Sequence, residues 1–181
     1  VLSGWIIGFV FVWIFIFLEK PVVAWFQRQQ HSTQYGSLFL LSLLLIGIGY
    51  ILKSAFAFWK LPAEWVNLAL ASAPSATIFE PFSLAGLITS AAAFFGMTSG
   101  AIWIKAQGDF SKAENFRQGL ARFAIGLIGV LILWAGLDLV FPAGESLIAG
   151  FFRYLRYALV GFWIGGFSPW LFIKFKLAHP R

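Results

Sequence analysis

Arg153 and Arg156 are the residues of this sequence best placed to bind a charged group. They are three positions apart, so on a helix their side chains would share a face, with Tyr154 and Tyr157 beside them. Asp138 lies near the end of the preceding apolar run. Ionisable side chains close to membrane depth are costly and tend to be functional. Arg153, Arg156 and Asp138 are therefore candidates for a substrate or lipid headgroup site, in which the two arginines would contact a lipid phosphate. The alternative for the arginines is interfacial snorkelling or an ion pair with Asp138.

The rest of the sequence offers no catalytic or metal-binding motif. His31 and His179 are the only histidines, and neither has a carboxylate placed to orient it as a nucleophile. The sequence contains no Cys, no GxxxxGK[ST] phosphate loop and no HExxH pair. His and carboxylate residues do not cluster as metal ligands would. We predict that this chain holds no catalytic residue, no metal and no cofactor.

The composition predicts an integral membrane protein. The 181 residues are 60% hydrophobic and 11% charged, whereas a soluble domain is about 25% charged. Lys and Arg outnumber Asp and Glu by 13 to 7. These basic residues lie between apolar runs and near their ends, so we interpret them as topology signals and contacts with membrane lipids. A nucleic-acid partner is excluded because the chain cannot present a continuous basic surface to water.

Five apolar runs are candidates for crossing a hydrocarbon core, which takes roughly 20 helical residues. They cover about residues 1–18, 38–52, 83–104, 120–141 and 158–173. Unpaired backbone groups are costly in lipid, so the runs should be helices. The predicted fold class is all-α: a polytopic membrane helical bundle with about five transmembrane helices plus short interfacial helices.

Proline and polar residues predict the structure of the segments that connect the runs. The first run should end at the charged pair before Pro21, and PVVAWFQRQQ after it should lie along the interface. HSTQYGS (31–37) is predicted to be a loop, LPAEWVNLALASA (61–73) a short interfacial or re-entrant helix, and PSATIFEPF (74–82) a loop. The fifth run should begin with a partly polar turn, FFRYLRY (151–157), before its apolar part. Pro169 should kink this run because proline lacks a backbone donor.

Gly96 and Gly100 form a GxxxG pair in a run that is dense in small residues. Such a pair lets another helix approach closely. Packing within the chain is one interpretation, and a homo-oligomer is the alternative.

The distribution of Lys and Arg predicts the orientation. Nine of them fall on one side of the membrane and four on the other. The first side has Lys20, Arg28, Lys105, Lys112, Arg117, Arg122, Lys174, Lys176 and Arg181, and the second has Lys53, Lys60, Arg153 and Arg156. The positive-inside rule then places the carboxy terminus in the cytoplasm and Val1 on the outer face. Because the sequence begins with Val1 and its single Met is Met97, we expect a fragment that follows an upstream helix.

The amino-terminal stretch VLSGWIIGFVFVWIFIFLEKPVVAW resembles a segment of bacterial members of the type 2 phosphatidic acid phosphatase family. In that family the third motif, SRxxxxxHxxxD, is followed by a hydrophobic residue, a small residue and then GW, which Gly4 and Trp5 match. Residues 115–147 and 151–178 resemble the extension of the longer members. The similarity covers nearly the whole chain through its apolar pattern and a few landmarks. These are Gly4, Trp5, Arg122, Pro142, Arg153, Tyr154, Arg156, Tyr157, Pro169 and Trp170.

The resemblance implies two parts and an activity. Residues 1–30 would be the last core helix of a phosphatase-type domain plus an interfacial segment, and residues 31–181 a membrane extension of about four helices. The whole protein would hydrolyse a lipid phosphate or isoprenoid diphosphate through a phosphohistidine at the outer face of the bacterial cytoplasmic membrane.

The family's three motifs, KxxxxxxRP, PSGH and SRxxxxxHxxxD, are all absent from this sequence. This chain alone is therefore expected to be inactive, with the missing amino-terminal catalytic helices as its partner. Two alternatives stay open: a small membrane transporter or channel, and a noncatalytic membrane assembly module.

Overall fold

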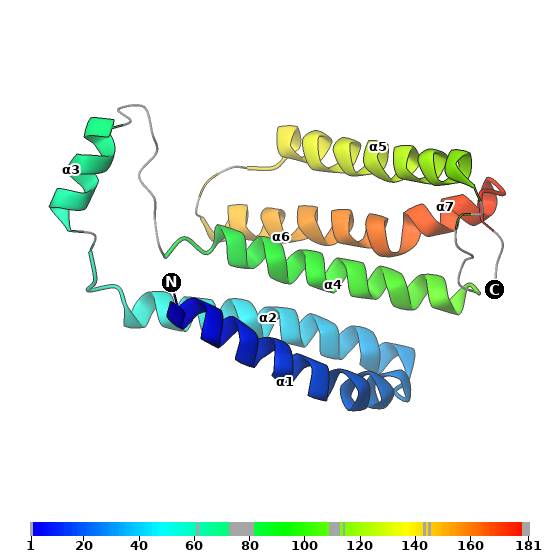
Figure 1. Cartoon of the computed structure of the whole chain (residues 1–181). Helices are drawn as coiled ribbons and strands as arrows, with labels where there is room; N and C mark the ends of the chain where they lie inside the picture. Colours follow the sequence, from blue (N-terminus) through cyan, green and yellow to red (C-terminus); the bar gives the residue numbers. More distant parts are fainter. Residues whose placement is uncertain are drawn as a thin grey trace. The chain divides into compact units, whose positions relative to one another are not determined.

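The computed structural model describes residues 2–60, 62–72, 82–108, 113, 115–142, 144 and 146–178. Every regular element in this part of the chain is a helix (Figure 1). The elements are α1 (Leu2–Gln27), α2 (His31–Ala55), α3 (Ala63–Ser72), α4 (Ala85–Ala106), α5 (Phe116–Val140), α6 (Leu147–Phe162), the π-helical turn η1 (Trp163–Phe167) and α7 (Ser168–Lys174). Among the described residues, five segments are long and apolar enough to cross a membrane, and α6, η1 and α7 together make the fifth. The predicted all-α membrane fold is confirmed.

The first helix does not end before Pro21, as the sequence suggested. Helix α1 continues through Pro21 to Gln27, so residues 21–27 are its last two turns and not a separate interfacial helix. A proline removes only one backbone donor. The apolar residues on both sides still need intrahelical hydrogen bonds in lipid, which favours continuation of the helix.

The polar stretch HSTQYGS, predicted to be a loop, is helical, and the partly polar start of the fifth run is helical as well. HSTQYGS begins α2, where the Gln34 side-chain amide donates to the Phe26 carbonyl at 2.9 Å and Ser37 donates to the Gln34 carbonyl at 3.0 Å. FFRYLRY lies inside α6, whose amino-terminal cap is the Ser146 side chain, which accepts from the Ala149 amide at 3.1 Å. Local side-chain hydrogen bonds thus satisfy polar groups near the starts of both helices.

The short helix predicted after the second span is present as α3, ten residues long. Its interfacial or re-entrant placement stays a prediction. Of the loop predicted at 74–82, all but Phe82 lies outside the described residues.

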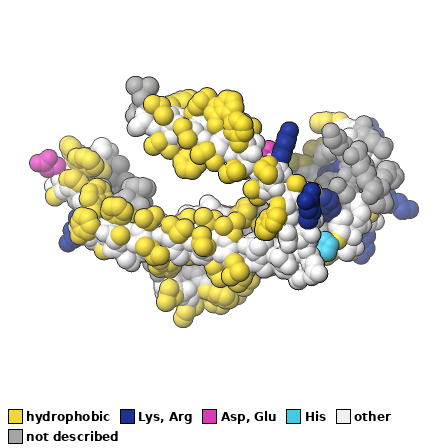
Figure 2. Space-filling view, turned by 90° about the horizontal axis from the view of Figure 1, so that it is seen from below, with side chains coloured by type: hydrophobic (Ala, Val, Ile, Leu, Met, Phe, Trp, Pro, Cys, Tyr) yellow, Lys and Arg dark blue, Asp and Glu magenta, His cyan; other side chains and the backbone are white. Residues whose placement is uncertain are grey.

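The chain divides into two compact units, Val1–Leu38 and Phe39–Arg181. In the first unit, α1 is apolar around its whole circumference, and its described side chains are nearly all exposed, with Trp5 at 76%. Figure 2 shows how extensively hydrophobic side chains cover the helices on the visible face. Such a helix is stable only where lipid or other apolar helices surround it.

The core of the second unit is the packing of α4 against α6 and η1. Helix α6 contacts both α4 and α5 and lies between them (Figure 1). Alanine and glycine make the α4 face, with Ala91 and Ala92 almost completely buried. A Cβ added at Gly96 would lie 2.9 Å from the Phe162 amide nitrogen and closer still to the Ala158 carbonyl oxygen. The two backbones are therefore in direct contact.

Gly100 has a glycine partner in η1. A Cβ on Gly100 would lie 2.6 Å from the Gly166 nitrogen, and a Cβ on Gly166 would lie 2.8 Å from the Gly100 Cα. On α6, a Cβ on Gly161 would lie 2.6 Å from the Ala93 carbonyl oxygen. Gly96 and Gly100 thus pack within the chain, and the glycines of α6 and η1 that complete this contact were not predicted as their partners.

The π-helical turn explains how the last span accommodates Pro169. The Ser168 amide donates to the Trp163 carbonyl, five residues back, in place of the usual four. Pro169, at the start of α7, has no amide hydrogen for the carbonyl of Gly165. The predicted interruption of the last run is therefore a π turn, and it brings Gly165 and Gly166 against α4.

Alanine substitutions on α4 test this backbone contact. We expect Gly96→Ala to lower the free energy of unfolding by about 1–3 kcal/mol, since the added methyl overlaps the α6 backbone. The matched control is Gly86→Ala on the same helix, where a Cβ meets nothing within 4 Å. It should change stability by less than about 1 kcal/mol, in the stabilising direction. Unfolding in mixed micelles, followed by circular dichroism, measures both variants, and equal stability of the two would refute the contact.

Candidate functional site

Two of the predicted site residues, Arg156 and Asp138, form an ion pair. Arg156 projects from α6 and is only 9% exposed, and its Nη1 contacts Oδ1 of Asp138, near the end of α5. The Asp138 side chain is 61% exposed. The guanidinium also lies over the Tyr157 ring, 5.0 Å from its centroid. The ion-pair alternative for these residues is therefore the arrangement in the structure, and it neutralises Arg156.

This ion pair is one of several polar contacts that hold α5 to the last span. Trp163 Nε1 donates to the Gly126 carbonyl at 3.0 Å, and the indole occupies the space where Gly129 would have a side chain. Nearer the start of α5, Arg122 Nε donates to the Leu177 carbonyl at 2.9 Å. Contacts of this kind matter because lipid surrounding a helix removes the hydrophobic drive for helices to associate.

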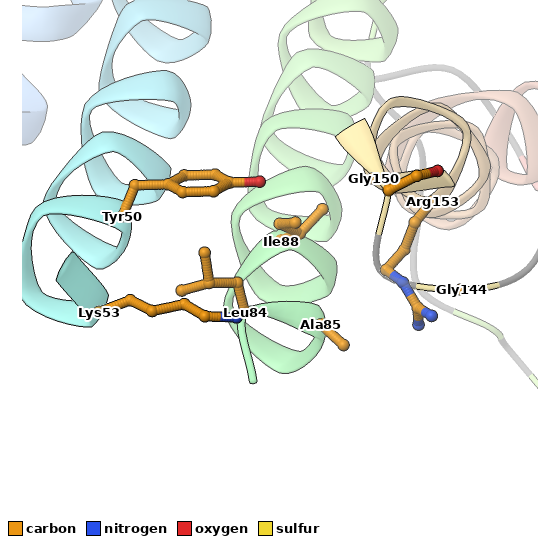
Figure 3. A pocket seen from close by; sticks show the side chains of 9 residues that line it. Tyr50, Lys53, Leu84, Ala85, Ile88, Gly144, Gly150 and Arg153 are labelled. Atoms are coloured by element: carbon orange, nitrogen blue, oxygen red, sulfur yellow. The ribbon is translucent and has the colours of Figure 1, made fainter. Parts of the chain in front are cut away.

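Arg153 lies in a different environment from Arg156. It lines a cavity of about 60 Å³ together with Tyr50 and Lys53 of α2 and residues around the starts of α4 and α6 (Figure 3). Figure 3 shows Tyr50 and Lys53 extending from α2 toward α4, and Arg153 directed toward Gly144. Arg153 is half-buried and makes no hydrogen bond or ion pair with another described residue. The two arginines are close in sequence, yet Arg156 pairs with Asp138 and Arg153 lines the cavity.

A polar contact between two side chains joins α2 to α6. The Ser42 hydroxyl, completely buried, donates to the Phe39 carbonyl at 2.8 Å. Its single hydrogen is thereby used, so in the 2.6 Å contact between Ser42 and Tyr154 the tyrosine hydroxyl is the donor. The centroid of the Tyr154 ring lies 6.4 Å from that of Phe39 and 6.3 Å from that of Phe95, and the two phenylalanine centroids are 5.5 Å apart.

Tyr50, Lys53 and Ser42 were not predicted from the sequence as neighbours of the Arg153 region, and Lys53 was used only as a charge that indicates the orientation. No local pattern identifies these residues, because they meet α6 only through the packing of helices far apart in the sequence. The glycine partners of α4 did have a signal, since Gly161 and Gly165 are themselves a GxxxG pair.

His31 is the first residue of α2 and is exposed, and His179 lies outside the described residues. Within the described part of the chain, no group of three or more His, Cys, Asp or Glu could hold a metal ion.

A double-mutant cycle tests the pairing of Asp138 with Arg156. Asp138→Asn should lower the free energy of unfolding by about 1 kcal/mol, a modest amount because the carboxylate is largely exposed. With Arg156→Gln the double variant should be non-additive by about 1 kcal/mol. The control cycle pairs Asp138→Asn with Arg153→Gln, and there the effects should add. Unfolding titrations in mixed micelles give all the values; additivity in both cycles would contradict the ion pair.

A comparison with known proteins finds a family match for the carboxy-terminal half of the chain. Residues 88–180 match the family described as PAP2 superfamily phosphatase, transmembrane extension. No curated protein and no solved structure matches the chain. The matched region begins within α4 and runs through α5, α6, η1 and α7, the helices that pack together in the second unit. The match covers more than half of the sequence and confirms the resemblance to a PAP2-type phosphatase. The chain therefore belongs to the transmembrane-extension family of the PAP2 superfamily phosphatases.

Proposed function

We propose that this chain supplies the membrane extension of a phosphatase that hydrolyses a lipid phosphate or isoprenoid diphosphate through a phosphohistidine. The observation that carries the proposal is the family match over residues 88–180. The absence of the KxxxxxxRP, PSGH and SRxxxxxHxxxD motifs from this sequence agrees with it, because the chemistry then belongs to other helices. The chain alone lacks a nucleophile and is inactive in this proposal.

The exposed apolar surface of α1 supports the proposal that this chain packs against separate catalytic helices. Helix α1 has a row of rings formed by Phe9, Trp13 and Phe17, with neighbouring centroids 6.0 and 5.9 Å apart. All three side chains are exposed. In the proposal residues 1–30 are the last helix of the phosphatase core, and this surface packs on the catalytic helices. Residues 31–181 form the extension.

We further propose that the protein lies in the bacterial cytoplasmic membrane with its carboxy terminus inside and the Val1 end outside. Lys105 lies in the last turn of α4, Lys174 is the last residue of α7, and Arg117 lies in the first turn of α5. Lys53 lies in the last turn of α2, at the opposite end of the bundle in this topology. The excess of positive charge at the end that holds Lys105, Arg117 and Lys174 favours this orientation under the positive-inside rule.

The activity is tested on the whole gene product. The coding sequence that surrounds this segment should encode the three motifs. The purified product in nanodiscs should then release phosphate from phosphatidate or an isoprenoid diphosphate. Replacing the His of its SRxxxxxHxxxD motif with Asn should abolish release, and the 181-residue chain in the same nanodiscs should release none. A gene without the motifs, or a product that stays active without the histidine, would overturn the proposal.

Single-cysteine labelling tests the orientation, and the absence of Cys from the chain removes any background. Phe58→Cys, at an exposed position after α2, should react with a membrane-impermeant maleimide added to intact cells. Gln107→Cys, at the exposed end of α4, should react only after the membrane is permeabilised. The reverse pattern would contradict the proposed orientation.

A further inference from the structure

The cavity beside Arg153 has the charge that a phosphate headgroup requires. Lys53 and Arg153 reach it from different helices, and Tyr50 contributes a phenol hydroxyl (Figure 3). Its volume of about 60 Å³ exceeds the roughly 10–15 Å³ that a single water needs. Arg presents a planar fork of donors that suits phosphate oxygens, and Lys supplies a compact positive charge.

Arg153 is available for such a ligand in a way that Arg156 is not. Asp138 neutralises Arg156 on the α5 side of α6. Arg153 has no hydrogen bond or ion pair with any residue of the described ranges, although it is half-buried. A partly buried guanidinium is costly without a partner, so this position favours an anion.

An apolar groove begins where the cationic cavity ends. This second cavity, of about 430 Å³, shares Tyr50, Ile88 and Gly150 with the first. Its other lining residues are aliphatic or aromatic, among them Leu43 and Phe151, and none is charged. The Tyr154 hydroxyl, the other phenol on its wall, is satisfied by Ser42. A hydrocarbon chain in the groove would therefore lie against an almost entirely apolar wall, with the Tyr50 hydroxyl at the junction of the two cavities.

We propose that the cationic cavity and the apolar groove together bind one anionic lipid that carries a terminal phosphate. The phosphate lies between Lys53 and Arg153, and the hydrocarbon chain passes Tyr50 and Gly150 into the groove. Inorganic phosphate would use only the first cavity, so the continuity of the two cavities favours the lipid. This inference goes beyond the proposed function, because it assigns lipid binding to the extension itself, whether or not the chain is joined to a catalytic domain.

Native mass spectrometry of the full 181-residue chain in detergent tests the site, with dioleoyl phosphatidate as probe and dioleoyl phosphatidylcholine as the neutral reference. One phosphatidate should bind in preference to phosphatidylcholine. The double variant Lys53→Gln, Arg153→Gln should weaken phosphatidate binding by about tenfold or more, since it removes two charged hydrogen-bond donors. Lys105→Gln, which removes an exposed cation at the other end of α4, should leave binding within about twofold. Equal binding by the double variant and the parent chain would overturn the proposal.

A second variant and a competitor separate the lipid from a free phosphate. A Cβ on Gly150 meets only Ile88 Cδ1, at 3.6 Å, so Gly150→Leu should fold while its side chain fills the junction of the two cavities. We expect it to weaken phosphatidate binding severalfold with its melting temperature kept. Inorganic phosphate should compete poorly against phosphatidate. Competition at matching concentrations, together with unchanged binding by Gly150→Leu, would show a phosphate site alone and refute the lipid.

Discussion

The backbone contact between α4 and the last span determines the arrangement of the second unit. In lipid, apolar side chains gain little by leaving their surroundings, so helices associate through close packing and polar contacts. Gly96 and Gly100 allow α4 to touch the backbone of α6 and η1, where Gly161 and Gly166 make the complementary surface. This contact requires glycine on both sides, which fixes the rotation of α6 about its own axis. The side chains on the rest of α6 then have determined neighbours.

Helix α5 is held by a different kind of interaction. Among its described residues, only Gly129 is buried. Its attachment rests on the Asp138 pair with Arg156, the Trp163 indole on Gly126, and Arg122 on the Leu177 carbonyl. These contacts are spaced along the whole helix, which suits an element whose other faces meet lipid. Hydrogen bonds between helices in membranes contribute about 0.6 kcal/mol each on average, so several are needed.

The sequence predicted the helical class, the five spans and the family, because hydropathy and composition report directly on burial in lipid. It misplaced the boundaries at Pro21 and at HSTQYGS, where polar residues and a proline stay helical because local hydrogen bonds are available or lipid forbids unpaired backbone. It identified Gly96 and Gly100 but not their partners. Lys53 and Tyr50 could not be assigned to the Arg153 cavity from sequence, because about 100 residues of chain separate them and only the packing of α2 near α6 brings them together.

The two arginines of α6 show why spacing alone misjudged the site. Three residues on an α-helix correspond to about 300°, so Arg153 and Arg156 are about 60° apart around the axis. That angle is small enough to predict that both side chains share one face of α6. In the structure, however, Arg156 faces α5 and Asp138, whereas Arg153 faces the cavity lined by α2 and α4. The α4 contact makes this division unavoidable, since rotating α6 to bring both arginines to Asp138 would break the glycine packing. Arg156 therefore stabilises the packing of α5 on α6, and Arg153 remains available for an anion near the starts of α4 and α6.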